Sequence, residues 1–228
     1  MVRPLVSTYQ SIHTAIGGEL LKLEAHAQSV DPNSAESVGG FASHLAMLEE
    51  IQEAHSHEEE QGLWPQIEAR LPGITATFLF DHEGERDYMS QIQAALGELQ
   101  QGSGDKKDAA ARLYRYAVAL SAHLIHHMSK EEALLYTPFA DKVSEQEESK
   151  IIYDLYEDLP EDLVVEAVPW EASYQDAEAI AEDSDILLKM VRPEKASLII
   201  KAIVNSLPPE KWGEVEKLRP NLATYRGA

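Results

Sequence analysis

Residues 55–65 read His-Ser-His-Glu-Glu-Glu-Gln-Gly-Leu-Trp-Pro, and residues 127–138 repeat the pattern as His-Met-Ser-Lys-Glu-Glu-Ala-Leu-Leu-Tyr-Thr-Pro. In each stretch a histidine is followed four residues later by a glutamate, and then by leucine, an aromatic residue and proline. Residues four apart on an α-helix lie on one face, with Cβ atoms about 5–6 Å apart. The repeat therefore predicts two helices that each present an imidazole and a carboxylate in one direction.

Helical patterning surrounds both stretches. Apolar residues recur every three or four positions, and no run of β-branched residues alternates with polar ones as in a strand. We expect four helices, separated by loop signals at residues 31–33, 71–73 and 101–104. Pro65 should kink the second helix. Four helices with short connections predict an all-α fold, with an up-down-up-down four-helix bundle over residues 1–143.

Residues 144–228 form a second region, which we expect to be a smaller helical C-terminal extension. Ser144-Glu-Gln-Glu147 has the spacing of a capping box and should open a helix that ends near Leu159. Further prolines predict three or four shorter helices after it; they are Pro169, Pro193, Pro208, Pro209 and Pro220. The region contains no histidine. We therefore assign it a packing, capping or interaction role.

The composition argues against several classes of function. The formal net charge is −21, from 19 Lys and Arg against 40 Asp and Glu, so we expect no nucleic acid and no membrane surface as a partner. No apolar run approaches the roughly 20 residues of a membrane span, and no signal-peptide pattern opens the sequence, which predicts a cytoplasmic location. The chain has no cysteine, so any metal would be held by histidine and carboxylate.

All nine histidines lie between positions 13 and 127. His13 and His82 fall in apolar settings on the first and third predicted helices, so every helix of the bundle carries a candidate ligand. Buried imidazoles and carboxylates without partners are costly, and a pair of cations would satisfy them. Such ligands suit Fe, Mn or Zn, and carboxylates that bridge two ions favour iron or manganese. We expect two iron ions, with Mn or Zn as alternatives. A ferritin-type site is disfavoured, because none of the histidines has a glutamate three residues before it.

In the order His, His-x3-Glu, His, His-x3-Glu, these residues resemble the hemerythrin-like proteins with an HHE cation-binding domain, over about residues 5–140. The resemblance implies a bundle with a non-haem di-iron centre. It makes His13, His55, His82 and His127 terminal nitrogen ligands and Glu59 and Glu131 the bridging carboxylates. Open coordination positions would take oxygen, peroxide or nitric oxide.

Two departures from the family's oxygen carriers narrow the expected function. Those proteins typically have a second histidine four residues after the one on the third helix, where this chain has Arg86, and His-x4-Asp on the fourth helix, where this chain has His127-x3-Glu131. Both differences resemble the bacterial and regulatory members. With fewer nitrogen ligands the site should be more open to water, which favours peroxide or oxygen reactivity, or sensing, over reversible carriage.

Four further residues are candidates for an extra ligand or for supporting one: His123, one turn before His127, together with His44, Glu58 and Arg86. Arg86 has two interpretations, a buried partner of a bridging carboxylate or of peroxide, and an outward ion pair, which we favour slightly. Helix geometry turns His26, His57 and His126 away from the ligand faces. We expect Glu60 and Glu132 to be mostly solvated charges.

Three functions remain open at this point. The first is a di-iron protein that binds or turns over a small oxidant, with catalase-like peroxide consumption or oxidase activity as the enzymatic forms. The second is a sensor of oxygen or iron whose metal state alters the packing or partner binding of residues 144–228. The third is a metal-free helical interaction protein, which metal analysis would exclude or establish.

Overall fold

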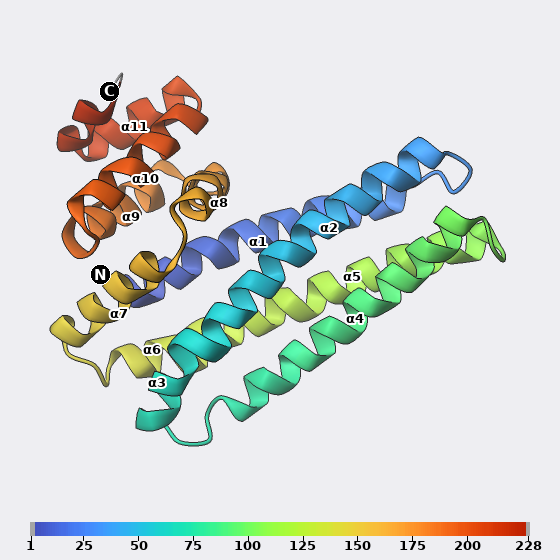
Figure 1. The fold of residues 1–228 in the computed structure, drawn as a ribbon, viewed down its shortest axis with the longest axis horizontal. Coiled ribbons are helices and arrows are strands. Elements are labelled where there is room, and N and C mark those ends of the chain that lie inside the picture. The colour runs from blue at the N-terminus through green and yellow to red at the C-terminus, as the bar shows by residue number, and fades with distance from the viewer. Residues whose placement is uncertain (1–2, 227–228) are drawn as a thin grey trace. The chain divides into compact units, whose positions relative to one another are not determined.

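The computed structural model describes residues 3–226, and over this range the chain is helical and contains no strand (Figure 1). In chain order its elements are α1 (Pro4–Ser29), α2 (Ala35–Glu58), the π-helix η1 (Glu59–Leu63), α3 (Trp64–Arg70), α4 (Ala76–Gln101), α5 (Lys106–Lys130), the π-helix η2 (Glu131–Tyr136), α6 (Thr137–Ala140), α7 (Glu145–Asp158), α8 (Glu161–Tyr174), α9 (Ala177–Met190), α10 (Pro193–Ser206), α11 (Pro209–Leu218) and the 3₁₀-helix η3 (Pro220–Tyr225). The predicted all-α fold class is confirmed. None of these helices combines the length and the apolar character that crossing a membrane requires.

Contacts group the chain into two compact units. The bundle unit comprises residues 16–135, and the C-terminal unit comprises the described residues up to Ala15 together with those from Tyr136 onward. The division falls inside α1 and inside η2. The domain boundary predicted after residue 143 stays a prediction, because the grouping follows contacts and assigns the first turns of α1 to the C-terminal helices.

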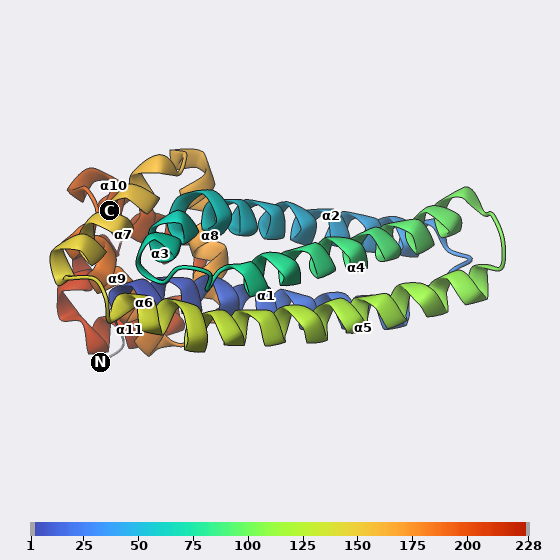
Figure 2. The same ribbon diagram turned by 90° about the horizontal axis from the view of Figure 1, so that it is seen from below.

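Four long helical segments make up the bundle unit: residues 16–29 of α1, then α2, α4 and α5, which run side by side in Figures 1 and 2. Hydrogen bonds link each neighbouring pair: Glu19 with His44, Gln52 with Glu85, Asp81 with His127, and Ser121 with the carbonyl oxygen of Leu20. Short loops join α1 to α2 and α4 to α5, so consecutive helices run antiparallel, as the sequence predicted.

Local sequence signals account for the helix ends in the bundle unit. The side chain of Ser34 caps α2 by accepting a hydrogen bond from the backbone N–H of Ser37, and Asp105 caps α5 in the same way from Lys107. At the end of α4, Gly102 adopts a φ of 64°, a left-handed conformation that costs glycine little. Each polar cap contributes about 1 kcal/mol to helix stability.

Apolar stripes of the four helices fill the core of the bundle. Phe41, Leu48, Ile92, Leu113 and Leu124 are fully buried. Burying one such side chain stabilises the fold by about 1.5–3 kcal/mol. The core is therefore able to hold the helices in register at the end of the bundle where the polar side chains gather.

Two π-helical turns interrupt the long helices, and the sequence analysis did not predict them. η1 begins at Glu59 and η2 begins at Glu131, the glutamates of the two repeated stretches. In η1 the backbone N–H of Trp64 donates to the carbonyl oxygen of Glu59, the five-residue spacing of a π-helix. The expected disturbance at Pro65 therefore takes the form of a widened turn before the proline.

The C-terminal unit is built from the shorter helices α7 to α11. The predicted capping box of α7 is present: the hydroxyl of Ser144 accepts from the backbone N–H of Glu147, whose carboxylate accepts from the backbone N–H of Ser144. The expectation that Pro169 separates two helices is wrong, because α8 continues through it. Ile152, Ile199, Ile200 and Trp212 are buried in this unit.

Polar contacts explain why the start of α1 groups with the C-terminal helices. The guanidinium of Arg3 pairs with Glu148 of α7 at 2.8 Å, and the backbone N–H of Leu5 donates to the same carboxylate. One and a half turns further on, the hydroxyl of Ser11 donates to Asp183 of α9 at 2.6 Å. These contacts span more than one hundred positions of sequence, so local patterning could not reveal them.

Candidate metal centre

Four acidic and basic side chains converge inside the bundle unit. Ligand-type atoms of Glu59, His82, His127 and Glu131 all lie within 4.8 Å of one another. The two glutamates are 0% exposed and the two histidines 1% and 2%. The side chains come from η1, from α4, and from α5 with its direct continuation η2, so three different segments of the bundle meet at one enclosed point.

Both His-x3-Glu pairs have the geometry predicted from their spacing. Nε2 of His55 lies 3.2 Å from Oε1 of Glu59, and Nε2 of His127 lies 3.1 Å from Oε1 of Glu131. Nε2 of His82 lies 3.5 Å from the other oxygen of Glu59. In each contact the nitrogen that faces the carboxylate is Nε2, which leaves Nδ1 of His82 and of His127 for other partners.

Two of these imidazole rings are oriented by carboxylates that bind Nδ1, the ring nitrogen that does not face the cluster. Nδ1 of His82 donates to Glu60 at 2.7 Å, and Nδ1 of His127 donates to Asp81 at 3.2 Å. Lys130 pairs with the same oxygen of Asp81. Such partners fix the tautomer of a metal-binding histidine and raise its basicity. Glu60, which we expected to be mostly solvated, instead holds a buried ring.

The aromatic residues of the repeated stretches pack against histidines. Trp64 stacks on His82, with ring centroids 4.8 Å apart and 18° between the planes. Tyr136 takes the place of Trp64 in the second stretch, and within the C-terminal unit its ring centroid lies 6.1 Å from that of His13. The leucine–aromatic–proline tail of each stretch therefore places a flat apolar surface against an imidazole, which restricts the ring and keeps water away from it.

Glu85 lies beside this cluster, and the sequence analysis missed it. Its side chain is 4% exposed; Oε2 accepts a hydrogen bond from Gln52 at 2.8 Å, and Oε1 lies 3.6 Å from Nε2 of His127. The family's pattern on this helix concerns the position four residues after the histidine, which is Arg86 in this chain. The residue three after His82 lies on the same face, and that spacing could have found it.

Burial and neighbouring charges shift several pKa values in the cluster. Burial lowers the pKa of His82, but the carboxylates of Glu59, Glu85 and Glu60 outweigh this effect and raise the pKa to about 9. Burial raises the pKa of Glu85 and lowers that of His127. Burial also opposes ionisation of Asp81, but Lys130 and His127 hold the pKa of its carboxyl below the usual value. The carboxylates of Glu59, Glu85 and Glu60 thus favour a positive charge on the ring of His82.

The residues present fit a bound metal cation. Nε2 of His127 is enclosed and has no hydrogen-bond partner among the described residues. A buried nitrogen or oxygen atom without a partner is costly, and a cation that accepts its lone pair removes that cost. Imidazole and carboxylate ligands without sulfur suit Fe, Mn or Zn.

The remaining predicted site residues lie in different settings. His13 is 4% exposed on the part of α1 that belongs to the C-terminal unit, and its role as a ligand stays a prediction. His123 donates from Nε2 to the backbone oxygen of Asp81 at 3.0 Å, and His44 donates to Glu19 at 2.8 Å. These bonds use one ring nitrogen of each histidine outside the cluster.

Two of the other candidates lie near the solvent. Arg86 is 59% exposed and lies 3.6 Å from Glu60, which agrees with the outward ion pair that we favoured. Glu58 is the last residue of α2, directly before the π-helical turn, and its side chain is partly exposed. His57 and His126 are exposed, as helix geometry predicted, and His26 is partly exposed beside His44.

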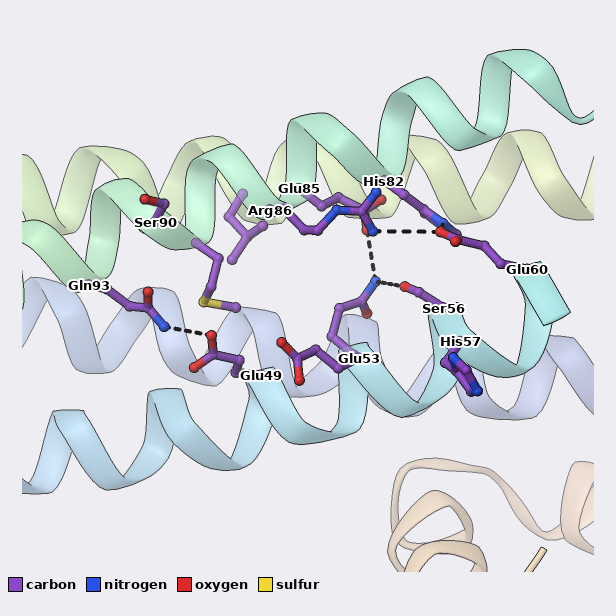
Figure 3. A pocket seen from close by; sticks show the side chains of 13 residues that line it. Glu49, Glu53, Ser56, His57, Glu60, His82, Glu85, Arg86, Ser90 and Gln93 are labelled. Atoms are coloured by element: carbon purple, nitrogen blue, oxygen red, sulfur yellow. Dashed lines mark hydrogen bonds and ion pairs between the residues drawn. The ribbon is translucent and has the colours of Figure 1, made fainter.

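A pocket of about 470 Å³ reaches the cluster from the surface between α2 and α4 (Figure 3). Its lining residues are Glu49, Gln52, Glu53, Ser56, His57, Glu60, His82, Glu85, Arg86, Met89, Ser90, Gln93 and Leu120. The close view shows Glu60 beside His82. The amide of Gln52 donates hydrogen bonds to Ser56 and to Glu85. The inner wall therefore includes His82 of the cluster and Glu85 beside it.

Comparison with known proteins found a matching family model and distant curated relatives. The model of the hemerythrin HHE cation-binding domain matches residues 5–139. Among curated proteins, a BRUTUS-like zinc finger protein of Arabidopsis thaliana is 22% identical over 82% of this chain and 15% of its own length, and zinc finger protein BRUTUS of the same plant is 22% identical over 80% and 14%. The chain thus spans about 15% of such relatives. No solved structure matches significantly.

The similarity to these plant proteins is longer than the family match. It covers 82% of the chain, more than residues 5–139 contain, so it includes part of the C-terminal helices. This chain has no cysteine, so the thiolate ligands common in zinc fingers are missing from it.

Proposed function

This chain belongs to the hemerythrin HHE cation-binding family, and from that premise we propose that it holds two non-haem iron ions bridged by the carboxylates of Glu59 and Glu131. One observation carries the proposal: Glu59, His82, His127 and Glu131 converge within 4.8 Å in an enclosed polar core. His55 would complete the set as the neighbour of Glu59, and the family pattern adds His13.

Iron is the metal that we propose, with manganese or zinc as the alternatives to be tested. Carboxylates that bridge two ions favour iron or manganese over a single zinc. A bound iron pair would supply redox chemistry with oxygen, peroxide or nitric oxide. The chain's own side chains would hold the metal, fix the imidazole rings through Glu60 and Asp81, and keep bulk water out with Trp64 and Phe78.

The reaction that we propose is binding or consumption of a small oxidant. Arg86 stands where the family's oxygen carriers have a histidine, and the pocket lined by His82 and Glu85 reaches this side of the cluster. A site with fewer nitrogen ligands and access from the surface favours reaction over reversible storage. Peroxide is small and neutral at pH 7, so the acidic lining would not repel it.

Metal analysis and turnover on the full chain test this function. We expect two irons per chain, an optical spectrum that changes on addition of peroxide, and peroxide consumption that stops after iron is removed with a chelator. Glu131→Ala should lose both iron and turnover, whereas Glu132→Ala, its neighbour, should keep them. A purified chain that binds no transition metal would rule the proposal out.

A second function, sensing of oxygen or iron, is favoured by the positions of two predicted ligands. His13 lies on the turns of α1 that belong to the C-terminal unit, and Glu131 opens η2, which continues into that unit at Tyr136. Both segments that connect the units thus carry a predicted ligand. Loss of metal could then alter the C-terminal helices through either segment.

Limited proteolysis with and without iron distinguishes the two functions. If the protein is a sensor, we expect iron removal to increase protease cleavage within residues 144–226, and we expect no peroxide turnover. An enzyme predicts turnover with little change in the cleavage pattern of those residues.

A further inference from the structure

The pocket between α2 and α4 has a strongly acidic lining that the proposed oxidant chemistry does not require. Glu49, Glu53, Glu60 and Glu85 line it together with a single arginine, Arg86. We propose that this pocket is the route by which a divalent metal cation enters the bundle, and that Glu85 is the carboxylate that receives the cation at the inner end. The inference rests on the proposed metal centre and adds the path by which metal ions reach that centre.

Charge along the pocket favours a cation over an anion. Arg86 pairs with Glu60 at the surface and His82 contacts the same carboxylate from the inner end, and this leaves Glu49 and Glu53 without an ion pair among the pocket residues. Glu49 accepts a hydrogen bond from Gln93, a neutral amide, which keeps its negative charge in the pocket. Clefts lined by one sign of charge concentrate ions of the opposite sign and speed their association.

The glutamates at the mouth of the pocket are more exposed to solvent than the glutamate at its inner end, as a route for cation transfer requires. Glu53 is exposed and Glu49 is partly exposed, so their carboxylates remain hydrated and can attract a hydrated cation without binding it tightly. Glu85 at the inner end is 4% exposed. A cation that moves inward therefore exchanges water for protein oxygen in steps.

A hydrogen bond to one carboxylate oxygen holds the side chain of Glu85 in place and leaves the other oxygen available to a cation. Oε2 accepts from Gln52 at 2.8 Å, and Gln52 also donates to Ser56. Oε1 has no hydrogen-bond partner among the described residues and lies 3.6 Å from Nε2 of His127. An enclosed carboxylate oxygen without a partner, next to the cluster and on the pocket wall, is an independent sign of a ligand that is not part of the protein.

Rates of metal uptake by the chelator-stripped full chain test the mouth of the pocket. Cobalt(II) is a suitable probe, because its absorption reports binding without oxidation. The double substitution Glu49→Gln with Glu53→Gln should lower the second-order rate constant about tenfold and weaken its dependence on salt. The amount bound at the end should not change. Glu50→Gln, an exposed residue of the same helix outside the pocket lining, is the matched control and should behave as the unchanged protein.

Glu85→Gln tests the inner end, with Glu83→Gln on the exposed face of α4 as its control. We expect slower uptake in Glu85→Gln, and two metal ions per chain at equilibrium. Unchanged uptake rates in both the double variant and Glu85→Gln would overturn the inference while leaving the metal centre intact. A drop to one ion in Glu85→Gln would also overturn it, since Glu85 would then be a permanent ligand. If the unchanged chain binds no metal, the proposed function itself fails.

Discussion

Nδ1 of His82 donates a hydrogen bond to Oε1 of Glu60 over 2.7 Å, and this bond turns Nε2 of the ring toward Glu59. The two residues come from α4 and from the π-helical turn after α2. Trp64 covers the ring from one face. The orientation of this predicted ligand thus depends on residues that are not ligands themselves.

Removal of Glu60 should weaken metal binding without removing a ligand. In Glu60→Ala the ring of His82 loses its orienting partner, and we expect the affinity for the metal to fall about 10- to 100-fold. Competition with a chromogenic chelator measures this affinity. Arg86→Ala removes only the exposed partner of Glu60 and should change the affinity little. Equal losses in both variants would contradict an orienting role for Glu60.

Asp81 should support His127 in the same manner. Asp81→Ala removes the acceptor of Nδ1 of His127, so we expect a loss of affinity of about 10- to 100-fold. Lys130→Ala is the control, because it removes the ion pair with Asp81 and keeps the bond to His127. If Lys130→Ala matched Asp81→Ala, the ion pair would be the important contact and the ring orientation would not.

Loss of a predicted ligand should lower iron content and thermal stability together. In His55→Ala and in Glu131→Ala we expect less than two irons per chain and a lower Tm, because a ligand bound only by the folded state adds about 3 kcal/mol of stability at one hundred times its Kd. Iron analysis and calorimetry of the same samples provide the measurement.

The metal-free forms of these variants provide the control. The carboxylates of Glu59 and Glu131 repel each other in the enclosed cluster when no cation is present. The difference in stability between Glu131→Ala and the unchanged protein should therefore be much smaller without metal than with metal. A full iron load in both variants would defeat the assignment of His55 and Glu131.

The stability of the C-terminal unit should fall as the pH rises. Burial raises the pKa of Glu171 to about 8 and that of Asp183 to about 6, from 4.5 and 3.8. Protonated carboxyls are therefore favoured in the folded state. The stability that they contribute is complete below the unfolded pKa values and is lost as the pH rises through 6 and then 8.

Urea unfolding of the metal-free chain at pH 5.5 and pH 8 measures this effect. In a Trp64→Phe background, fluorescence reports on Trp170 and Trp212, which lie in the C-terminal unit. Glu171→Gln cannot ionise and should show a smaller change in unfolding free energy between the two pH values. An identical pH dependence in Glu171→Gln and its parent would show that this carboxyl is not the cause.

Some features of the site could be predicted from the sequence, and others could not. The spacing of His127 and Glu131 predicted a shared helix face because helical geometry is local, and the contact at 3.1 Å has that form. Glu85 was not predicted, because the family's pattern has a spacing of four residues and Glu85 lies three residues after His82. The π-helical turns at Glu59 and Glu131 were missed because a helix pattern does not distinguish hydrogen bonds to the fourth residue from those to the fifth.

The sequence by itself determined that this chain is helical, that it lacks thiolate ligands, and that its histidines and glutamates recur on successive helices, since these properties depend on residue type and short-range period. Only the tertiary structure decided that Asp81 and Glu60 hold the rings, that Glu85 lines the pocket, and that Ser11 bonds to Asp183. The physical reason is that each of these contacts joins different helices. Their partners are set by how side chains pack across the bundle or the C-terminal unit, and no local repeat encodes that packing.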